Sequence, residues 1–303
     1  MSLLTVGTVA FDSIETPFGK VEKVIGGACT YISWAASYFT NDIRLTSIVG
    51  NDFPTDEIKQ LEARGVSMDG LKVVADGKTF FWSGKYHENM NQRDTLATDL
   101  NVLDDFDPEL PDNYKDSEFV MLGNLTPDIQ IRVVEQLNNP KVVALDTMNF
   151  WMDIAMDRLK VAISKVNILT INDEEARQLS GEYSLVNAAK KIHAMGPEYL
   201  IIKKGEHGAL LFHEGKMFFA PALPLAVVKD PTGAGDTFAG GFMGYLAKTG
   251  ELNYETLKTG IIYGSAMASF CVEEFSLEKM KTLTQDDIKS RVAQFVNMSQ
   301  FSI

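Results

Sequence analysis

The sequence predicts an α/β fold whose central sheet is mostly parallel and doubly wound. Short apolar runs alternate along the 303 residues with longer segments of helical periodicity. Most of these runs are apolar at every position, which is typical of strands that are buried on both faces. The alternation favours parallel strands that are joined by right-handed helical crossovers. An apolar content of 45% suffices for one large domain, and we expect residues 1–303 to form a single domain.

The elements follow one another in that alternation from the N-terminus onward. The apolar runs predict strands at Leu3–Val9, Leu45–Val49, Phe119–Leu122, Val142–Leu145, Ile168–Ile171, Leu200–Ile202 and Ala209–Phe212. The periodicity predicts helices at Thr30–Phe39, Thr55–Arg64, Pro127–Leu137, Glu174–Leu179, Ser184–Met195, Asp236–Ala247, Tyr254–Val272 and Gln285–Asn297. The helix after Thr126 has the clearest start, because threonine caps free N–H groups and proline is tolerated at the first helical position.

Two segments depart from the alternation. Residues 11–25 are short and polar, and Pro17 and Gly19 interrupt them. Residues 72–102 alternate apolar and polar side chains around a turn-like Glu-Asn-Met-Asn sequence at 88–91. Both segments predict β-structure outside the main sheet.

The composition narrows the class of protein. The formal charge is −13, and the acidic surface that this implies disfavours nucleic acid or an anionic membrane as partner. No stretch approaches 18 uncharged apolar residues, and no basic segment precedes the first apolar run, so we expect no membrane span and no signal peptide. Cys29 and Cys271 lie in apolar helix-like runs, which indicates buried thiols and a reduced, cytoplasmic setting.

Residues 230–242, Asp-Pro-Thr-Gly-Ala-Gly-Asp-Thr-Phe-Ala-Gly-Gly-Phe, carry the strongest functional signal. Free N–H groups at a helix start attract anions, and glycines let the backbone approach a ligand closely. We therefore expect Gly233, Ala234, Gly235 and the Asp236 backbone to form an anion hole. A carboxylate in that position suits a general base, which would take a proton from a hydroxyl while the turn holds phosphoryl charge. Asp236 is the predicted base.

This stretch resembles the C-terminal signature of the ribokinase-like carbohydrate and nucleoside kinases, the PfkB family. The resemblance implies a three-layer α/β/α sandwich that transfers the γ-phosphoryl group of ATP, with Mg²⁺, to a substrate hydroxyl. It also implies that residues 11–25 and 72–102 form a β lid over the substrate, which is often used in dimer contacts, so a homodimer through the lid is open. No Gly-Lys-Ser/Thr follows the glycines, so the turn is not a P-loop.

Further residues match the family's nucleotide site. Asn172 and Glu175 follow a predicted strand and resemble the Asn-x-x-Glu motif near Mg²⁺ and the ATP phosphates, although the same pattern also suits a capped helix start. Lys203 and Gly205 resemble the segment that lines the nucleotide, although a basic surface turn explains them equally well. The resemblance adds Thr232 to the cofactor-binding set.

The substrate residues are expected near the N-terminus. Asp12 ends the predicted strand that contains residues 7–12 and resembles the acid that binds substrate hydroxyls, and a carboxylate suits a vicinal diol. Gly26 and Gly27 match the N-terminal signature. Tyr31 stands where relatives commonly carry an asparagine that touches sugar hydroxyls. This departure leaves room for a base-bearing substrate.

Three other residues lie where ligands bind in such folds, at strand ends or in the signature. Asp146 ends the strand at Val142–Leu145 and is a candidate for metal or phosphate, while Asn124 ends another strand and is a weaker substrate candidate. Asp230 and Thr232 match positions whose carbonyl groups hold a monovalent cation in several relatives, so K⁺ dependence stays open.

Three functions remain open. The first is a kinase for a sugar or related small molecule, and the second is a nucleoside kinase of the adenosine type. The third is a non-catalytic homologue that only binds small molecules, against which Asp236 argues, because a degenerate copy usually loses the base first. A nicotinamide dehydrogenase is disfavoured, because residues 7–12 lack the Gly-x-Gly-x-x-Gly pattern.

Overall fold

A nine-stranded sheet forms the centre of the computed structural model, which describes residues 1–300. Its strands are, in spatial order, β13 (Lys216–Ala220), β12 (Ala209–His213), β11 (Tyr199–Lys203), β10 (Ile168–Asn172), β9 (Val142–Asp146), β8 (Phe119–Leu122), β1 (Leu3–Val6), β4 (Ile43–Gly50) and β5 (Val66–Val74). All neighbours from β11 to β5 are parallel, whereas β12 pairs antiparallel with β11 and β13.

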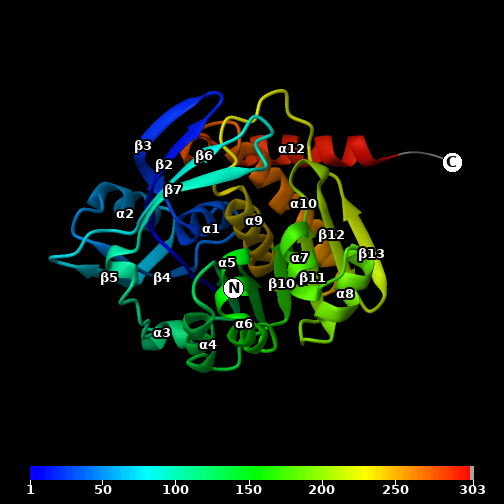
Figure 1. Cartoon of the computed structure of the whole chain (residues 1–303), viewed down its shortest axis with the longest axis horizontal. Helices are drawn as coiled ribbons and strands as arrows, with labels where there is room; N and C mark the ends of the chain where they lie inside the picture. Colours follow the sequence, from blue (N-terminus) through cyan, green and yellow to red (C-terminus); the bar gives the residue numbers. More distant parts are fainter. Residues whose placement is uncertain (301–303) are drawn as a thin grey trace.

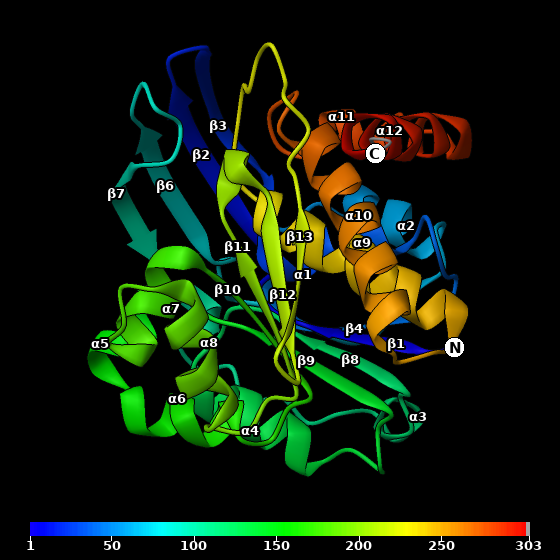
Figure 2. The ribbon, with the colours of Figure 1, turned by 90° about the vertical axis from the view of Figure 1, so that its right-hand side faces the viewer.

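Helices cover both faces of this sheet, as Figures 1 and 2 show. One face carries α1 (Ala28–Ala36), α2 (Thr55–Glu62), α9 (Ala234–Thr249) and α10 (Tyr254–Cys271), with α11 (Glu278–Lys281) and α12 (Gln285–Ser299) beside α10. The other face carries α3 (Asp112–Lys115), α4 (Pro127–Glu135), α5 (Asn149–Ile154), α6 (Met156–Ile163), α7 (Asp173–Ser180) and α8 (Leu185–His193). Short 3₁₀ turns lie at Asn101–Leu103 and Gly205–His207.

The all-apolar strands explain these layers. Side chains of a strand alternate between the two faces of its sheet. Phe119 and Met121 accordingly join the core under α1, α9 and α10, whereas Val120 and Leu122 join the core under α4 to α8. All four are at most 1% exposed. The predicted three-layer α/β/α arrangement is therefore confirmed, and so is the helix start at Thr126, whose hydroxyl accepts the Ile129 N–H at 3.4 Å.

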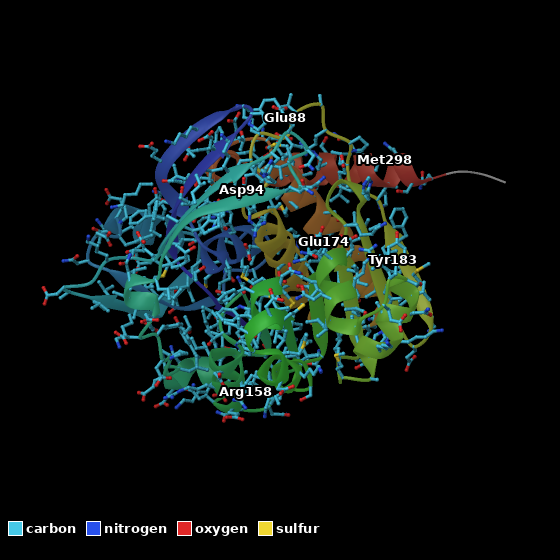
Figure 3. All side chains as sticks on the ribbon, viewed as in Figure 1. Glu88, Asp94, Arg158, Glu174, Tyr183 and Met298 are labelled. Carbon is cyan, nitrogen blue, oxygen red and sulfur yellow. The ribbon has the colours of Figure 1, made fainter. Side chains whose placement is uncertain are left out.

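A second, four-stranded sheet stands at one end of the main sheet, in the order β3 (Gly19–Gly26), β2 (Ala10–Thr16), β6 (Phe81–Tyr86) and β7 (Arg93–Asp99). We call it the small sheet; it is blue and cyan at the upper left of Figure 1. β2 and β6 are parallel, and the other pairs are antiparallel. Glu88 and Asp94 mark the β6–β7 hairpin in Figure 3.

Two predictions about the strands were wrong. Leu3–Val9 is not one strand, because β1 ends at Val6 and the chain then crosses to the small sheet. Beyond the end of β1, the Ser47 hydroxyl accepts the Val9 N–H at 3.1 Å. Asp12 consequently lies inside β2 and not at the end of a strand. Residues 72–74, expected outside the main sheet, belong to its edge strand β5.

Cys29 and Cys271 are buried and free. Within residues 1–300, no helix combines the length and the apolarity needed to cross a bilayer.

Candidate active site

The glycine turn at residues 232–235 leads directly into α9. Gly233 precedes the helix in the left-handed conformation, with φ 73°, which glycine adopts at little cost. The Ala234 N–H donates to the Pro231 carbonyl at 3.2 Å, so its predicted place in the anion hole is taken by a turn hydrogen bond. The N–H groups of Gly233 and Gly235 have no acceptor within residues 1–300. The Asp236 N–H is likewise without a backbone acceptor in that part of the chain, so the turn leaves these three amides free for an anion.

Asp236 lies in the first turn of α9, and the pKa of its carboxyl group is close to neutral pH. Its pKa is raised to about 7, first by burial and then by the Asp146 carboxylate, whereas the positive charges of Lys203 and Arg93 oppose the rise. A pKa near neutrality is what a general base needs at physiological pH.

Lys203 lies where the ends of β11 and β9 meet the glycine turn. It ends β11, and its Nζ lies 2.7 Å from Oδ2 of Asp146, which ends β9. A Cβ atom added to Gly235 would stand 3.3 Å from the same Nζ. The amino group therefore lies beside the glycine turn, between the predicted base and a buried carboxylate.

Asn172 and Glu175 form a capping box at the start of α7. Asn172 Oδ1 accepts the Glu175 N–H at 2.8 Å, and Glu175 Oε2 accepts the Asn172 N–H at 2.7 Å. The capped-helix interpretation thus describes the local geometry. Glu175 is nevertheless 5% exposed, and burial raises its pKa to about 7, with Lys203 opposing and Asp146 adding to the rise. A residue that only caps a helix at the surface would be exposed, so the burial of Glu175 indicates a further role.

These acids fit Mg²⁺ only together with other ligands. No cluster of three or more His, Cys, Asp or Glu side chains that could hold a metal occurs in residues 1–300. Both carboxylate oxygens of Asp146 are engaged, Oδ1 by the Thr147 N–H at 2.9 Å and Oδ2 by Lys203. Mg²⁺ commonly keeps several waters and takes substrate phosphates as ligands. Glu175, with one oxygen outside the capping box, is the better protein donor.

Asp12 lies on the other side of the turn, in β2. It is 5% exposed, and burial raises its pKa to about 7, with the charges of Asp230 and Asp236 adding to the rise. A Cβ atom at Gly26 would come within 2.0 Å of the Asp12 carboxylate. Gly27 has φ 92° and caps α1. Gly26 therefore leaves the space that the Asp12 carboxylate occupies, whereas Gly27 lies against the backbone of Thr8.

The remaining predicted residues lie around this centre. Tyr31 is 1% exposed, and a Cβ atom at Gly233 would meet its ring at 2.5 Å, so it packs beneath the turn. The Asn124 amide is engaged by Trp151 Nε1 at 2.8 Å and by Met148 Sδ at 3.0 Å. Their roles as substrate residues stay predictions.

Asp230 ties the turn to the segment that follows α10. Its Oδ1 accepts the Thr232 N–H at 2.8 Å, and its Oδ2 accepts the Ser276 N–H at 3.2 Å. Burial raises its pKa. The predicted cofactor residue Gly205 begins the 3₁₀ turn after β11.

Two residues of the small sheet belong to the site, although no motif identified them. The Thr232 hydroxyl donates to Tyr86 Oη at 3.1 Å. Arg93 lies opposite Tyr86 in the β6–β7 ladder, and its charge lowers the pKa of both Asp236 and Glu175. The alternating pattern of residues 72–102 predicted strands here, but not which side chains face the turn.

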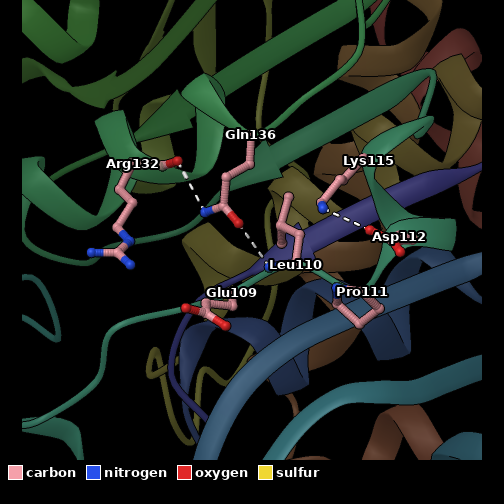
Figure 4. Close-up of a pocket in the computed structure, with 7 residues that line it drawn as sticks. All are labelled: Glu109, Leu110, Pro111, Asp112, Lys115, Arg132 and Gln136. Atoms are coloured by element: carbon pink, nitrogen blue, oxygen red, sulfur yellow. Dashed lines mark hydrogen bonds and ion pairs between the residues drawn. The ribbon is translucent and has the colours of Figure 1, made fainter.

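A hollow elsewhere on the molecule is unrelated to this site. Figure 4 shows it between the segment before α3 and the end of α4, lined by Glu109, Leu110, Pro111, Asp112, Lys115, Arg132 and Gln136. Gln136 Oε1 accepts the Leu110 N–H at 2.9 Å, and Lys115 pairs with Asp112 at 2.7 Å. None of the predicted site residues lines it.

Known proteins are similar to most of this chain. A family model described as pfkB family carbohydrate kinase matches residues 4–282. A cytidine kinase of Thermococcus kodakarensis is 27% identical over 248 residues, which cover 80% of this chain and 87% of that enzyme.

Solved structures resemble it over nearly their full length. A Burkholderia thailandensis nucleoside kinase in complex with inosine has a TM-score of 0.79 at 21% identity, covering 98% of this chain and 99% of that one. A ribokinase-like protein of E. coli in complex with ATP and Mg²⁺ has a TM-score of 0.80 at 18% identity, covering 97% and 99%. The predicted ribokinase-like fold is confirmed.

Proposed function

The chain belongs to the PfkB family of carbohydrate kinases, and from that premise we propose that it transfers the γ-phosphoryl group of ATP to a hydroxyl group of a nucleoside. The observation that carries the proposal is the position of Asp236, a carboxyl group with its pKa near 7 in the first turn of α9, beside the free amides of the glycine turn. A free sugar is the second candidate substrate.

Each step of the phosphoryl transfer is assigned to a residue of the site. Asp236 accepts the proton of the acceptor hydroxyl as its oxygen bonds to the γ-phosphorus. The bond between that phosphorus and the oxygen bridging to the β-phosphate breaks, and ADP leaves with that oxygen. The free N–H groups of Gly233 and Gly235 face the developing negative charge, and the amino group of Lys203 adds positive charge beside them.

Mg²⁺ supplies charge neutralisation on the triphosphate when bound. Glu175 would hold it through water, and Asp146, engaged by Lys203, would act on it indirectly. We also propose that K⁺, if used, binds carbonyl oxygens at Asp230 and Thr232, because both carboxylate oxygens of Asp230 already accept N–H groups. Replacing K⁺ by Na⁺ in the assay tests this.

A nucleoside is favoured over a free sugar for two reasons. The similar proteins include a cytidine kinase and a nucleoside kinase in complex with inosine. Tyr31 replaces the asparagine that the family commonly uses for sugar hydroxyls, while the buried Asp12 carboxylate remains to bind the two ribose hydroxyls.

The small sheet is proposed to act as the lid, since Tyr86 already contacts the turn from it. Phe18 and Leu96, 53% and 59% exposed on or beside this sheet, support a homodimer through it, which the molar mass in solution would reveal. The free cysteines support a cytoplasmic setting.

A binding panel followed by an activity assay tests the function. The protein is mixed with Mg²⁺ and a non-hydrolysable ATP analogue, and its unfolding temperature is recorded with cytidine, inosine, adenosine, ribose and fructose. Compounds that raise it are then assayed with ATP for a phosphorylated product. We expect product from at least one nucleoside. Stabilisation and product with ribose, but with no nucleoside, would overturn the preferred substrate class and leave the sugar kinase.

A further inference from the structure

Tyr86 connects the small sheet to the phosphate-binding turn. It ends β6 with its side chain 6% exposed, and its Oη accepts a hydrogen bond from the Thr232 hydroxyl at 3.1 Å. The two residues are 146 positions apart in the sequence. This hydrogen bond joins a strand of the small sheet to the residue that precedes Gly233.

Thr232 is held on its other side as well. Its N–H donates to Asp230 Oδ1 at 2.8 Å. A threonine that is fixed through both its backbone and its hydroxyl has little freedom to rotate. The next residue, Gly233, carries one of the free amides of the turn and occupies the left-handed conformation. The direction of that amide therefore depends on how Thr232 is held.

The same hairpin contacts a second turn of the site. In the β6–β7 turn, Asn91 donates through Nδ2 to Glu206 Oε1 at 3.4 Å, and its Oδ1 would lie 3.2 Å from a Cβ atom at Gly205. Gly205 and Glu206 follow Lys203, whose amino group lies beside Gly235. The hairpin thus spans the two turns that lie around the proposed phosphate position.

Resting on the proposed kinase function, we propose that Tyr86 is a positioning residue that acts through Thr232. When the small sheet covers the site, the Tyr86–Thr232 hydrogen bond holds the glycine turn with its amides directed at the phosphate. When the small sheet moves away, the bond is broken and the turn loses that restraint. Closure of the lid and formation of the anion hole are then one event, which limits transfer of the phosphoryl group to water.

A double-mutant cycle tests this coupling. Tyr86→Phe removes only the phenol oxygen, and Thr232→Val removes only the hydroxyl at nearly constant volume. A net hydrogen bond of this kind corresponds to about three- to tenfold in kcat/KM. We expect each variant to lose about that factor and the double variant to lose no more than the worse single one. Losses that multiply would show that the residues act independently and would overturn the proposal.

A second measurement separates positioning from mere stability. In Tyr86→Phe, ATP hydrolysis without acceptor should rise at least about threefold relative to phosphoryl transfer, because water enters a site that is not held closed. The control is Lys85→Gln, which breaks the exposed Lys85–Glu15 pair of the same sheet and should leave this ratio unchanged. An unchanged ratio in Tyr86→Phe, or an equal rise in the control, would refute the coupling.

Failure of the kinase function remains distinguishable. If the wild type phosphorylates no acceptor, hydrogen exchange is measured with Mg²⁺ and a non-hydrolysable ATP analogue. The proposal then requires residues 81–86 and 231–235 to become protected together in the wild type, and residues 231–235 to lose that protection in Tyr86→Phe. Protection of the turn that is equal in both proteins would overturn it.

Discussion

Replacing Asp236 by asparagine should remove the base and stabilise the fold at the same time. The carboxyl group has its pKa raised from 3.8 to about 7, first because it is buried and then because of Asp146. Asparagine has nearly the same shape but cannot accept the proton. General-base catalysis contributes about 10²–10⁴-fold, so kcat should fall at least about a hundredfold, whereas ATP binding should be largely retained.

The effect of Asp236→Asn on the free energy of unfolding follows from the same pKa. Since the folded-state pKa lies above the unfolded-state value, the folded protein binds this proton more tightly. The stability that the group contributes is full below about pH 4 and is lost as the pH rises toward about 7. The rise corresponds to as much as about 4 kcal/mol above pH 7. Between about pH 5.5 and pH 8, the advantage of Asp236→Asn should therefore grow by about 2 kcal/mol.

The assay combines turnover, ATP-binding isotherms and denaturant unfolding at both pH values. Asp105→Asn, at an exposed loop position, serves as the control for loss of a charge and should change none of these quantities. Turnover within tenfold of the wild type would refute the catalytic role of Asp236. A stability difference that stays constant between the two pH values would refute the burial of its charge.

Three further perturbations address the same site. The wild-type kcat/KM should rise with pH through about 7 and then level off as Asp236 ionises, so a flat profile from about pH 6 to pH 8 would contradict the assignment. Lys203→Met should lower the unfolding free energy by about 3–5 kcal/mol, because Asp146 is left buried without its partner; denaturant unfolding measures this loss. The same variant should raise the KM for ATP, which steady-state kinetics measures. Gly233→Ala should destabilise more than Gly181→Ala in denaturant unfolding, because both glycines have φ near 70° but only Gly233 has a side chain packed against it; equal losses would contradict the contact.

Local patterns predicted the parts of the molecule that local physics controls. A strand that is buried on both faces must be apolar at each position, and Phe119–Leu122 was therefore recognised to its last residue. β13 was missed because most of its side chains are exposed or partly exposed, so no continuous apolar run marks it. The break after Val6 was missed because the apolar Val9 follows closely in the sequence, although the chain has already left the main sheet there.

The sequence by itself determined the layers of the fold and the glycine turn with its acid. Those features depend on apolar periodicity and on the conformational freedom of glycine, which are properties of neighbouring residues. Only the tertiary structure decided that Tyr86 contacts the turn and that the charge of Arg93 acts on Asp236. It also decided that the charge of Asp146 raises the pKa of Asp236, and that the charge of Asp236 raises the pKa of Asp12. Charge interactions and burial depend on distance in space, and residues far apart in the chain leave no local pattern that records it.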